Sequence, residues 1–158
     1  MVYFFWKSAS PASQWHPSTF TIDNEEYCCA EQWMMRAKAK LFDAPETEVL
    51  IMKCRDPRRI KALGGAKYVP KFDSKTWEAH RFDIVVRGNY AKFSQNPNLR
   101  DWLLATKDEE LIESSPVDRI YGIGYTAEDA VKVDRSLWGL NLLGKALMEV
   151  RTQLRSEQ

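Results

Sequence analysis

The sequence predicts an α+β, predominantly helical fold: a single compact domain over residues 1–158 with a few short strands. Three observations lead to this prediction. A chain of 158 residues falls within the roughly 100–200 residues typical of one domain. Apolar residues recur at helical spacing through much of the chain, whereas extended runs are few and short. No linker, repeat or low-complexity tract interrupts the sequence.

The first 30 residues show little helical periodicity and contain many helix breakers. Tyr3–Trp6 predicts a short buried strand, and the serine- and proline-rich stretch Ser8–Ser18 predicts a loop. Phe20–Ile22 and Glu25–Tyr27 flank the dipeptide Asp23-Asn24, which favours a tight turn. This segment therefore predicts a small β-hairpin.

Six helices are expected in the rest of the chain. Apolar stripes with residues three or four apart indicate several of them. Proline or a capping residue marks where helices begin, and a glycine pair marks one end. The predicted helices begin at Ala30 (stripe Ala30, Met34, Ala37, Leu41), Pro45, Pro57 after the cap Asp56, the cap Ser74 (stripe Trp77, Arg81, Val85, Gly88), Pro97, and near Asn141 (stripe Leu143, Leu147, Val150, Leu154).

The composition favours a soluble cytoplasmic protein. Lys and Arg number 23 against 22 Asp and Glu, a formal net charge of +1, which argues against extended binding to nucleic acid or to an anionic membrane. No run is long and apolar enough for a membrane helix, and the N-terminus lacks the features of a secretory signal. Three cysteines, two of them adjacent, make a poor disulfide framework and favour a reducing compartment.

The common catalytic and metal-binding signatures are missing from the sequence. There is no HExxH, P-loop, GxSxG or Rossmann glycine motif, and His16 and His80 lack metal-ligand spacing. Neither a metal ion nor another cofactor is expected. Cys28 and Cys29 fit small buried hydrophobic residues better than nucleophiles, since no base accompanies them.

Glu31 and Lys38 stand seven residues apart on the first predicted helix. This spacing puts both on one side of the helix, about 10 Å from each other along its axis. The separation is too long for a routine ion pair but suits two groups that hold the ends of a ligand. On spacing alone, a solvated flank of the helix is the more frequent arrangement.

The segment Ser114–Gly124 contains one acid, Asp118, and the glycines Gly122 and Gly124. Glycine lets the backbone approach a ligand closely, and its amide can face phosphate or ribose oxygens; a structural turn is an equally good interpretation. Leu111–Glu113 and Arg119–Tyr121 are candidates for short extended structure. Aromatic residues in loops or at helix starts could stack on a heterocyclic base: Trp15, Trp77, Tyr121 and Trp138.

Several motifs follow one another in a fixed order along nearly the whole chain. They are Tyr3–Phe5, Ser13–Pro17, Tyr27, Glu31–Met35, Lys38-Ala39, Ala62–Gly64, Trp77 with Arg81, Lys92–Pro97, Asp118–Gly124 and Asn141–Met148. In this combination they resemble the YbiA/NADAR family of N-glycosidases. The resemblance implies a predominantly helical fold with minor strands.

The resemblance also implies an enzyme that hydrolyses the N-glycosidic bond between a (phospho)ribose and a nitrogen base. The expected partner is a small phosphoribosyl or ADP-ribosyl compound, with early phosphorylated riboflavin-pathway intermediates first. Removal of ADP-ribose from guanine is the alternative within the family. A non-catalytic module that binds ADP-ribose or NAD is the other alternative, but a pure binder would not need Glu31, Lys38 and Asp118 together.

With this resemblance, Glu31 is expected to stabilise the cationic sugar or to activate water, and Asp118 to act as acid or orienting group. Lys38 would either contact a phosphate or hydroxyl or attack the anomeric carbon of an opened ribose. Trp15 and Trp77 are expected to stack on the base. Arg81, Gly122, Gly124 and Asn141 complete the predicted substrate-binding set.

The chain departs from the family pattern at Gly65, where an arginine is frequent. Arginine suits phosphate binding, because its planar guanidinium can donate two parallel hydrogen bonds to phosphate oxygens. Either Arg58, Arg59 or Lys61 takes over its phosphate contact, or the preferred substrate differs.

Overall fold

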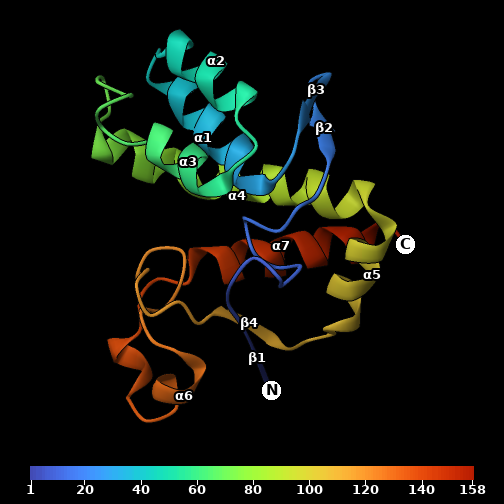
Figure 1. The fold of residues 1–158 in the computed structure, drawn as a ribbon. Coiled ribbons are helices and arrows are strands. Elements are labelled where there is room, and N and C mark those ends of the chain that lie inside the picture. Colours follow the sequence, from blue (N-terminus) through green and yellow to red (C-terminus); the bar gives the residue numbers. More distant parts are fainter. The chain divides into compact units, whose positions relative to one another are not determined.

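The structure is a computed structural model that describes residues 1–158, with seven α-helices, one short 3-10 helix and four short strands (Figure 1). Helices hold 51% of the residues and strands 9%, which confirms the predominantly helical α+β prediction. The chain divides into two compact units, residues 17–96 and residues 1–16 together with 97–158. One domain over residues 1–158 stays a prediction. None of the helices combines the length and the apolar character needed to cross a membrane.

Residues 17–96 begin with the predicted hairpin, formed by β2 (Phe20–Ile22) and β3 (Glu25–Tyr27). The strands are antiparallel, with Phe20 opposite Tyr27. At the turn, Asp23 and Asn24 have φ of 52° and 65°, a left-handed conformation that these two residue types tolerate. The turn predicted from this dipeptide is confirmed.

Four helices follow the hairpin: α1 (Ala30–Leu41), α2 (Pro45–Lys53), α3 (Pro57–Leu63) and α4 (Ser74–Gln95). Their starts agree with the prediction, since proline opens α2 and α3 and the Asp56 carboxylate accepts a bond from the Arg58 N–H. The N-cap of α4 is Asp73 rather than Ser74. The Asp73 carboxylate accepts bonds from the N–H and hydroxyl of Thr76, and a charged oxygen is the stronger acceptor.

Helix α1 packs against α2, α3 and α4. Its Trp33 donates from the indole nitrogen to the Ile84 carbonyl of α4 at 2.8 Å, and the ring lies where a side chain at Gly88 would stand. On another side of α1, Met35 fills the space beside Gly64 at the end of α3. These contacts make α1 the centre of this unit.

A single amide, Gln32, joins the start of α1 to the end of α2. Its oxygen accepts the Cys28 N–H at 2.8 Å, and its nitrogen donates to the carbonyls of Ile51 and Cys54. Gln32 is 3% exposed, so these bonds satisfy backbone groups that water would otherwise have to reach. The position of α1 relative to α2 is fixed by these bonds.

In the second unit, β1 (Val2–Phe5) and β4 (Glu110–Glu113) pair in parallel, from Val2 opposite Glu110 to Phe5 opposite Glu113. Helix α7 (Leu142–Ser156) packs against β4 and against α5 (Pro97–Ala105). The predicted stripe of α7 is fully confirmed, because its four members are all buried: Leu143, Leu147, Val150 and Leu154.

Two short elements of this unit were not expected, α6 (Ala127–Ala130) and the 3-10 helix η1 (Arg135–Leu137). Neither is long enough to show an apolar stripe. The prediction of extended structure at Arg119–Tyr121 is wrong, because no strand forms there. The N–H groups of Ile120 and Tyr121 bond to the Asp118 carboxylate, and their carbonyls accept bonds from α7, so no backbone groups are left for a strand partner.

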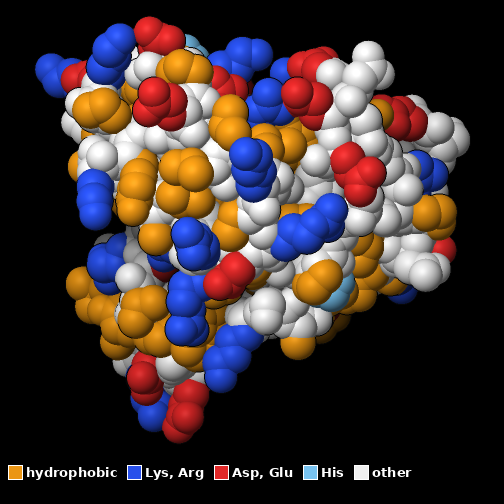
Figure 2. Space-filling view, turned by 45° about the horizontal axis from the view of Figure 1, so that its top comes forward, with side chains coloured by type: hydrophobic (Ala, Val, Ile, Leu, Met, Phe, Trp, Pro, Cys, Tyr) orange, Lys and Arg blue, Asp and Glu red, His pale blue; other side chains and the backbone are white.

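The face of the molecule in Figure 2 mixes charged and apolar side chains. Lys and Arg, Asp and Glu, and hydrophobic side chains occur together on the face shown in Figure 2. This mixture agrees with the formal net charge of +1.

Candidate active site

Glu31 and Lys38 both lie on α1, and both are withdrawn from solvent. Glu31 is only 4% exposed, and Lys38 is half-buried. Glu31 belongs to the first turn of α1, where the helix dipole favours a negative charge. A solvated flank, which spacing alone favoured, is therefore wrong for Glu31.

The Lys38 ammonium lies over two aromatic rings. Its Nζ is 4.7 Å from the centroid of the Phe72 ring and 5.4 Å from that of the Trp77 ring, within the range of cation–π attraction. Burial lowers the pKa of Lys38, and the charge of Glu31 opposes this effect. The structure thus brings together Glu31, Lys38 and Trp77, as predicted, and adds Phe72.

Trp77 and Arg81 lie one turn apart on α4, so they share a face of that helix. Trp77 is 7% exposed, and Arg81 is half-buried. Phe72 precedes the N-cap Asp73, and Trp77 is the fourth residue of the helix. This is the spacing of a hydrophobic staple, a signal in the sequence that would have identified Phe72.

Two further titratable groups are buried in this unit. Burial raises the pKa of the Cys29 thiol to about 12, so Cys29 stays protonated and does not act as a nucleophile. Lys92 on α4 is fully buried, and this burial lowers its pKa to about 7. The sequence singles out Lys92 only as the start of the Lys92–Pro97 motif and its burial is not predicted, although Lys92 continues the stripe of α4 four residues beyond Gly88.

The unit formed by residues 1–16 and 97–158 contains the predicted loop. The Asp118 Oδ1 accepts bonds from the N–H groups of Ile120 and Tyr121, both at 2.9 Å. A side chain at Gly122 would stand 2.8 Å from the Glu113 carbonyl oxygen, and Gly124 has φ of +78°, where side chains are strained. A structural turn accounts for all three predicted residues, and their contacts to a ligand stay predictions.

The Asn141 side chain has a structural role, because it bonds to the backbone of β4. Its Oδ1 accepts the Glu113 N–H at 3.0 Å, and its Nδ2 donates to the Leu111 carbonyl at 2.9 Å, so its side chain holds β4. Asn141 has φ of 51° and is the N-cap of α7. The first N–H groups of this helix end, at residues 141, 142 and 143, donate to the carbonyls of Gly122, Ile120 and Tyr121. These three amides are therefore already bonded and do not face a phosphate, and a substrate contact by Asn141 stays a prediction.

The remaining aromatic candidates differ in how they are held. Trp15 is half-buried, in a loop where its N–H donates to the Ser13 hydroxyl at 3.1 Å. The Trp138 indole donates to the Ala130 carbonyl, and its ring packs edge-on to Phe4. Trp138 is thus half-buried and packs against the core cluster of Ile112, Ile123 and Ala130, whereas stacking by Trp15 stays a prediction.

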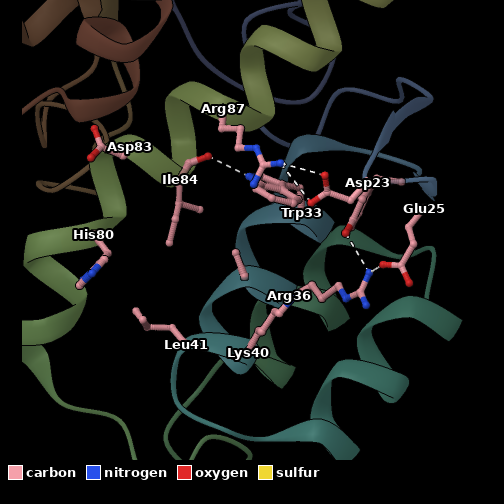
Figure 3. A pocket seen from close by; sticks show the side chains of 12 residues that line it. Asp23, Glu25, Trp33, Arg36, Lys40, Leu41, His80, Asp83, Ile84 and Arg87 are labelled. Atoms are coloured by element: carbon pink, nitrogen blue, oxygen red, sulfur yellow. Dashed lines mark hydrogen bonds and ion pairs between the residues drawn. The ribbon is translucent and has the colours of Figure 1, made fainter.

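A separate cavity of about 430 Å³ lies among the hairpin turn, β3, α1 and α4 (Figure 3). It faces the side of α1 opposite to Glu31 and Lys38, and none of the predicted catalytic or binding residues line it. Its arginines are paired within the wall: Arg36 with Glu25, and Arg87 with Asp23 at 3.1 Å. We therefore place the candidate active site at Glu31 and Lys38. No group of His, Cys, Asp and Glu side chains there or elsewhere is arranged to hold a metal ion.

The fold matches that of a solved protein. It aligns with the NMR structure of the Escherichia coli protein YbiA at a TM-score of 0.77 and 23% identity, over 99% of this chain and 86% of that one. The YbiA-like fold predicted from the sequence is confirmed.

The NADAR domain matches residues 4–155, so the chain belongs to the NADAR domain family. The chain is 45% identical to N-glycosidase R617 of Acanthamoeba polyphaga mimivirus over 147 residues. This alignment covers 89% of the chain and 85% of the viral protein. It is 29% identical over 162 residues to the chloroplastic riboflavin biosynthesis protein PYRR of Zea mays, over 96% of this chain but 24% of that protein. The resemblance read from the motifs is confirmed at the level of the family.

Proposed function

We propose that this chain is an N-glycosidase that hydrolyses the bond between a phosphorylated ribose and a nitrogen base. The observation that carries the proposal is the buried Glu31, whose charge interacts with the Lys38 amine on the same helix. The reaction class is supported by the name of the R617 relative.

Glu31 is proposed to stabilise the sugar. Cleavage of a ribosyl C–N bond builds positive charge on the anomeric carbon and the ring oxygen. A carboxylate about 4 Å from that charge contributes about 4 kcal/mol at an effective dielectric constant near 20, which is roughly a thousandfold in rate. Because Glu31 is buried, water screens its charge little.

Lys38 has two proposed roles, and its lowered pKa supports the covalent one. When the ribose ring opens, C1 becomes an imine carbon that is still bonded to the base nitrogen. The neutral Lys38 amine attacks this carbon, its proton passes to the departing base nitrogen, and water then hydrolyses the new imine to release the sugar. In the other role, the ammonium binds a phosphate or hydroxyl.

Reduction with borohydride separates these two roles. A covalent intermediate predicts a sugar-sized mass increase on the peptide that contains Lys38, seen only when substrate is present. Full turnover without this adduct supports the binding role.

The other residues are assigned by their chemistry. Asp118 is proposed to protonate the base or to orient the ribose hydroxyls through Oδ2, since its Oδ1 accepts two backbone bonds. Trp15 and Trp77 would stack on the base, and Arg81 would contact a phosphate. Gly122, Gly124 and Asn141 would shape the substrate-binding loop.

Early phosphorylated riboflavin-pathway intermediates are the first candidate substrates, supported by the name of the maize relative. ADP-ribosyl-guanine is the second candidate. It is favoured by the basic side chains of residues 53–61, which suit a substrate with several phosphates.

The proposal is tested by mass spectrometry of freed bases. The chain is incubated with ribosylated pyrimidines, ribosylated purines and ADP-ribosylated guanine, and Glu31→Gln serves as the matched control. We expect release of one base by the natural chain and a loss of release in the variant. Saturable binding of ADP-ribose without release of any base would contradict the enzyme and favour the non-catalytic module.

A further inference from the structure

The cavity among the hairpin turn, β3, α1 and α4 has the size of a ligand-binding pocket. Its volume is about 430 Å³, within the roughly 300–1,000 Å³ of pockets that hold small molecules. All of its lining residues belong to residues 17–96, so one unit of the chain builds it completely. Glu31 and Lys38 do not line it. The cavity is therefore a site of its own, separate from the candidate active site.

The apolar part of the cavity is only half covered. Ala37 and Leu41 of α1 and Ile84 of α4 line the cavity and are half-buried. Ala37 and Ile84 also pack against the core cluster that contains Trp33. The position of α1 against α4 is fixed there, because the Trp33 indole donates to the Ile84 carbonyl at 2.8 Å. A ligand with an apolar group would remove these three side chains from water, which is favourable.

Most charges of the wall are already neutralised. Arg87 donates from Nη2 to both oxygens of Asp23 at 3.1 Å, and its guanidinium lies 5.3 Å from the centroid of the Trp33 ring. Arg36 is paired with Glu25. Figure 3 shows both pairs on the side of the cavity next to the hairpin. These four charged groups bind one another and are not available to a ligand.

Two charges of opposite sign are left on the rim. Lys40 and Asp83 are exposed, and neither takes part in an ion pair. They come from α1 and α4, the two helices that line the cavity (Figure 3). The His80 Nδ1 donates to the Thr76 carbonyl at 2.8 Å, so the neutral ring offers only Nε2, as an acceptor. The rim therefore matches a ligand with one positive and one negative group better than an ion of either sign.

We propose that this cavity binds a small zwitterion with a large apolar side chain, the chemistry of a free aromatic amino acid. The ligand carboxylate pairs with Lys40, its ammonium pairs with Asp83, and its side chain covers the apolar part of the cavity. Because the ligand contacts both α1 and α4 in their folded arrangement, it stabilises this unit. The inference goes beyond the proposed function and does not depend on it.

Binding is tested by two-dimensional NMR of the full nitrogen-15-labelled chain, with tryptophan as the probe. Tryptamine lacks the carboxylate and 3-indolepropionate lacks the ammonium, so each analogue keeps the indole ring and one charge. We expect tryptophan to shift the signals of Ala37, Leu41, Ile84 and the Trp33 indole N–H saturably, with a dissociation constant of about 1 mM. Because an exposed ion pair contributes little, tryptophan should bind about threefold more tightly than either analogue.

Single substitutions assign the contacts. Lys40→Gln should remove the preference for tryptophan over tryptamine, and Asp83→Asn should remove the preference over 3-indolepropionate. The matched controls are Lys61→Gln and Asp101→Asn, which remove exposed charges that lie outside the lining and outside the ion pairs; they should leave all three affinities unchanged. Ala37→Leu fills the cavity without a change in charge and should abolish binding, with thermal unfolding to confirm the fold.

The inference is overturned by the absence of saturable shifts in the lining signals, or by equal affinities for tryptophan and both analogues. Unchanged tryptophan binding in Lys40→Gln and Asp83→Asn, or in Ala37→Leu, also overturns it. Shifts centred on Glu31 and Lys38 would place the ligand in the candidate active site and overturn it as well. The measurement involves no turnover, so a chain that releases no base can still confirm this site, and an active glycosidase can still lack it.

Discussion

The charged residues of the candidate site in residues 17–96 and the predicted loop residues of the other unit are held in different ways. In residues 17–96, Glu31 and Lys92 are buried and Lys38 is half-buried, and burial lowers the pKa of both lysines. In the other unit, the Asp118 Oδ1 and both side-chain polar atoms of Asn141 bond to the backbone. The first arrangement prepares groups that can change protonation, as acid–base chemistry needs, whereas the second fixes the shape of a loop.

Individual glycines of the two units also differ in which atoms lie beside them. In residues 17–96, Gly64 and Gly88 face side chains, those of Met35 and Trp33. In the other unit, Gly139 faces the backbone of Arg119. A side chain can move to make room, but a backbone held by hydrogen bonds cannot move without breaking them.

The largest expected effect is on kcat, and it separates the roles of Glu31 and Asp118. Glu31→Gln should lower kcat by roughly a thousandfold, because the sugar cation loses a buried charge. Asp118→Asn keeps the Oδ1 acceptor of the loop and should cost about a hundredfold. Both are measured as initial rates of base release, with thermal unfolding to confirm the fold. Near-normal turnover in both variants would refute the two-carboxylate scheme.

The next largest effect concerns the glycines. Gly139→Ala places a methyl group against the Arg119 backbone and should destabilise the chain by about 3 kcal/mol. Gly64→Ala meets the flexible Met35 side chain and should cost about 1 kcal/mol. Urea unfolding of the two variants measures the difference. A smaller loss of unfolding free energy for Gly139→Ala than for Gly64→Ala would contradict this difference between the two glycines.

Asn141 tests how much one side chain contributes to the stability of the unit formed by residues 1–16 and 97–158. Asn141→Ala removes two bonds to β4 and keeps the left-handed backbone, so we expect a loss of about 2 kcal/mol. Asn141→Gly removes the same bonds but relieves the backbone, and it should recover about 1 kcal/mol of that loss. If the two variants are equally stable, the backbone conformation contributes nothing.

A further prediction concerns the pH dependence of stability due to Lys92. Its pKa falls from 10.5 to about 7 on folding, so between these values the unfolded chain binds more protons than the folded chain. Stability should therefore rise with pH in this interval, by up to about 1 kcal/mol per pH unit, and lose this contribution as pH falls toward 7. Lys92→Met should lack the rise. Parallel stability curves from pH 7 to 10 would contradict the burial of a neutral amine.

The sequence predicted the regular elements well, because local chemistry decides them. Proline and Asp56 set the starts of α2 and α3, and Asp23-Asn24 set the hairpin turn. Arg119–Tyr121 was misread because its carbonyls bond to α7, a partner that lies about 20 residues further along the chain. Local propensity does not contain such contacts.

The candidate site was predictable in its residue types but not in its environment. Spacing placed Glu31 and Lys38 on one side of α1, but it could not show that the packing of the unit buries Glu31. The burial of Lys92 could have been inferred from the α4 stripe, and Phe72 from the staple spacing. The contacts of Asn141 with β4 depend on tertiary structure and carry no local signal.

The bonded amides at the start of α7 affect how proteins with this fold can change their ligand specificity. Many enzymes bind anions with main-chain amides at the start of a helix, and point mutations change such amides little. Here the helix has already given those amides to its own preceding loop. Residues 141–143 can therefore recognise a charged group only through their side chains, and single substitutions could change that preference without any change in the main chain.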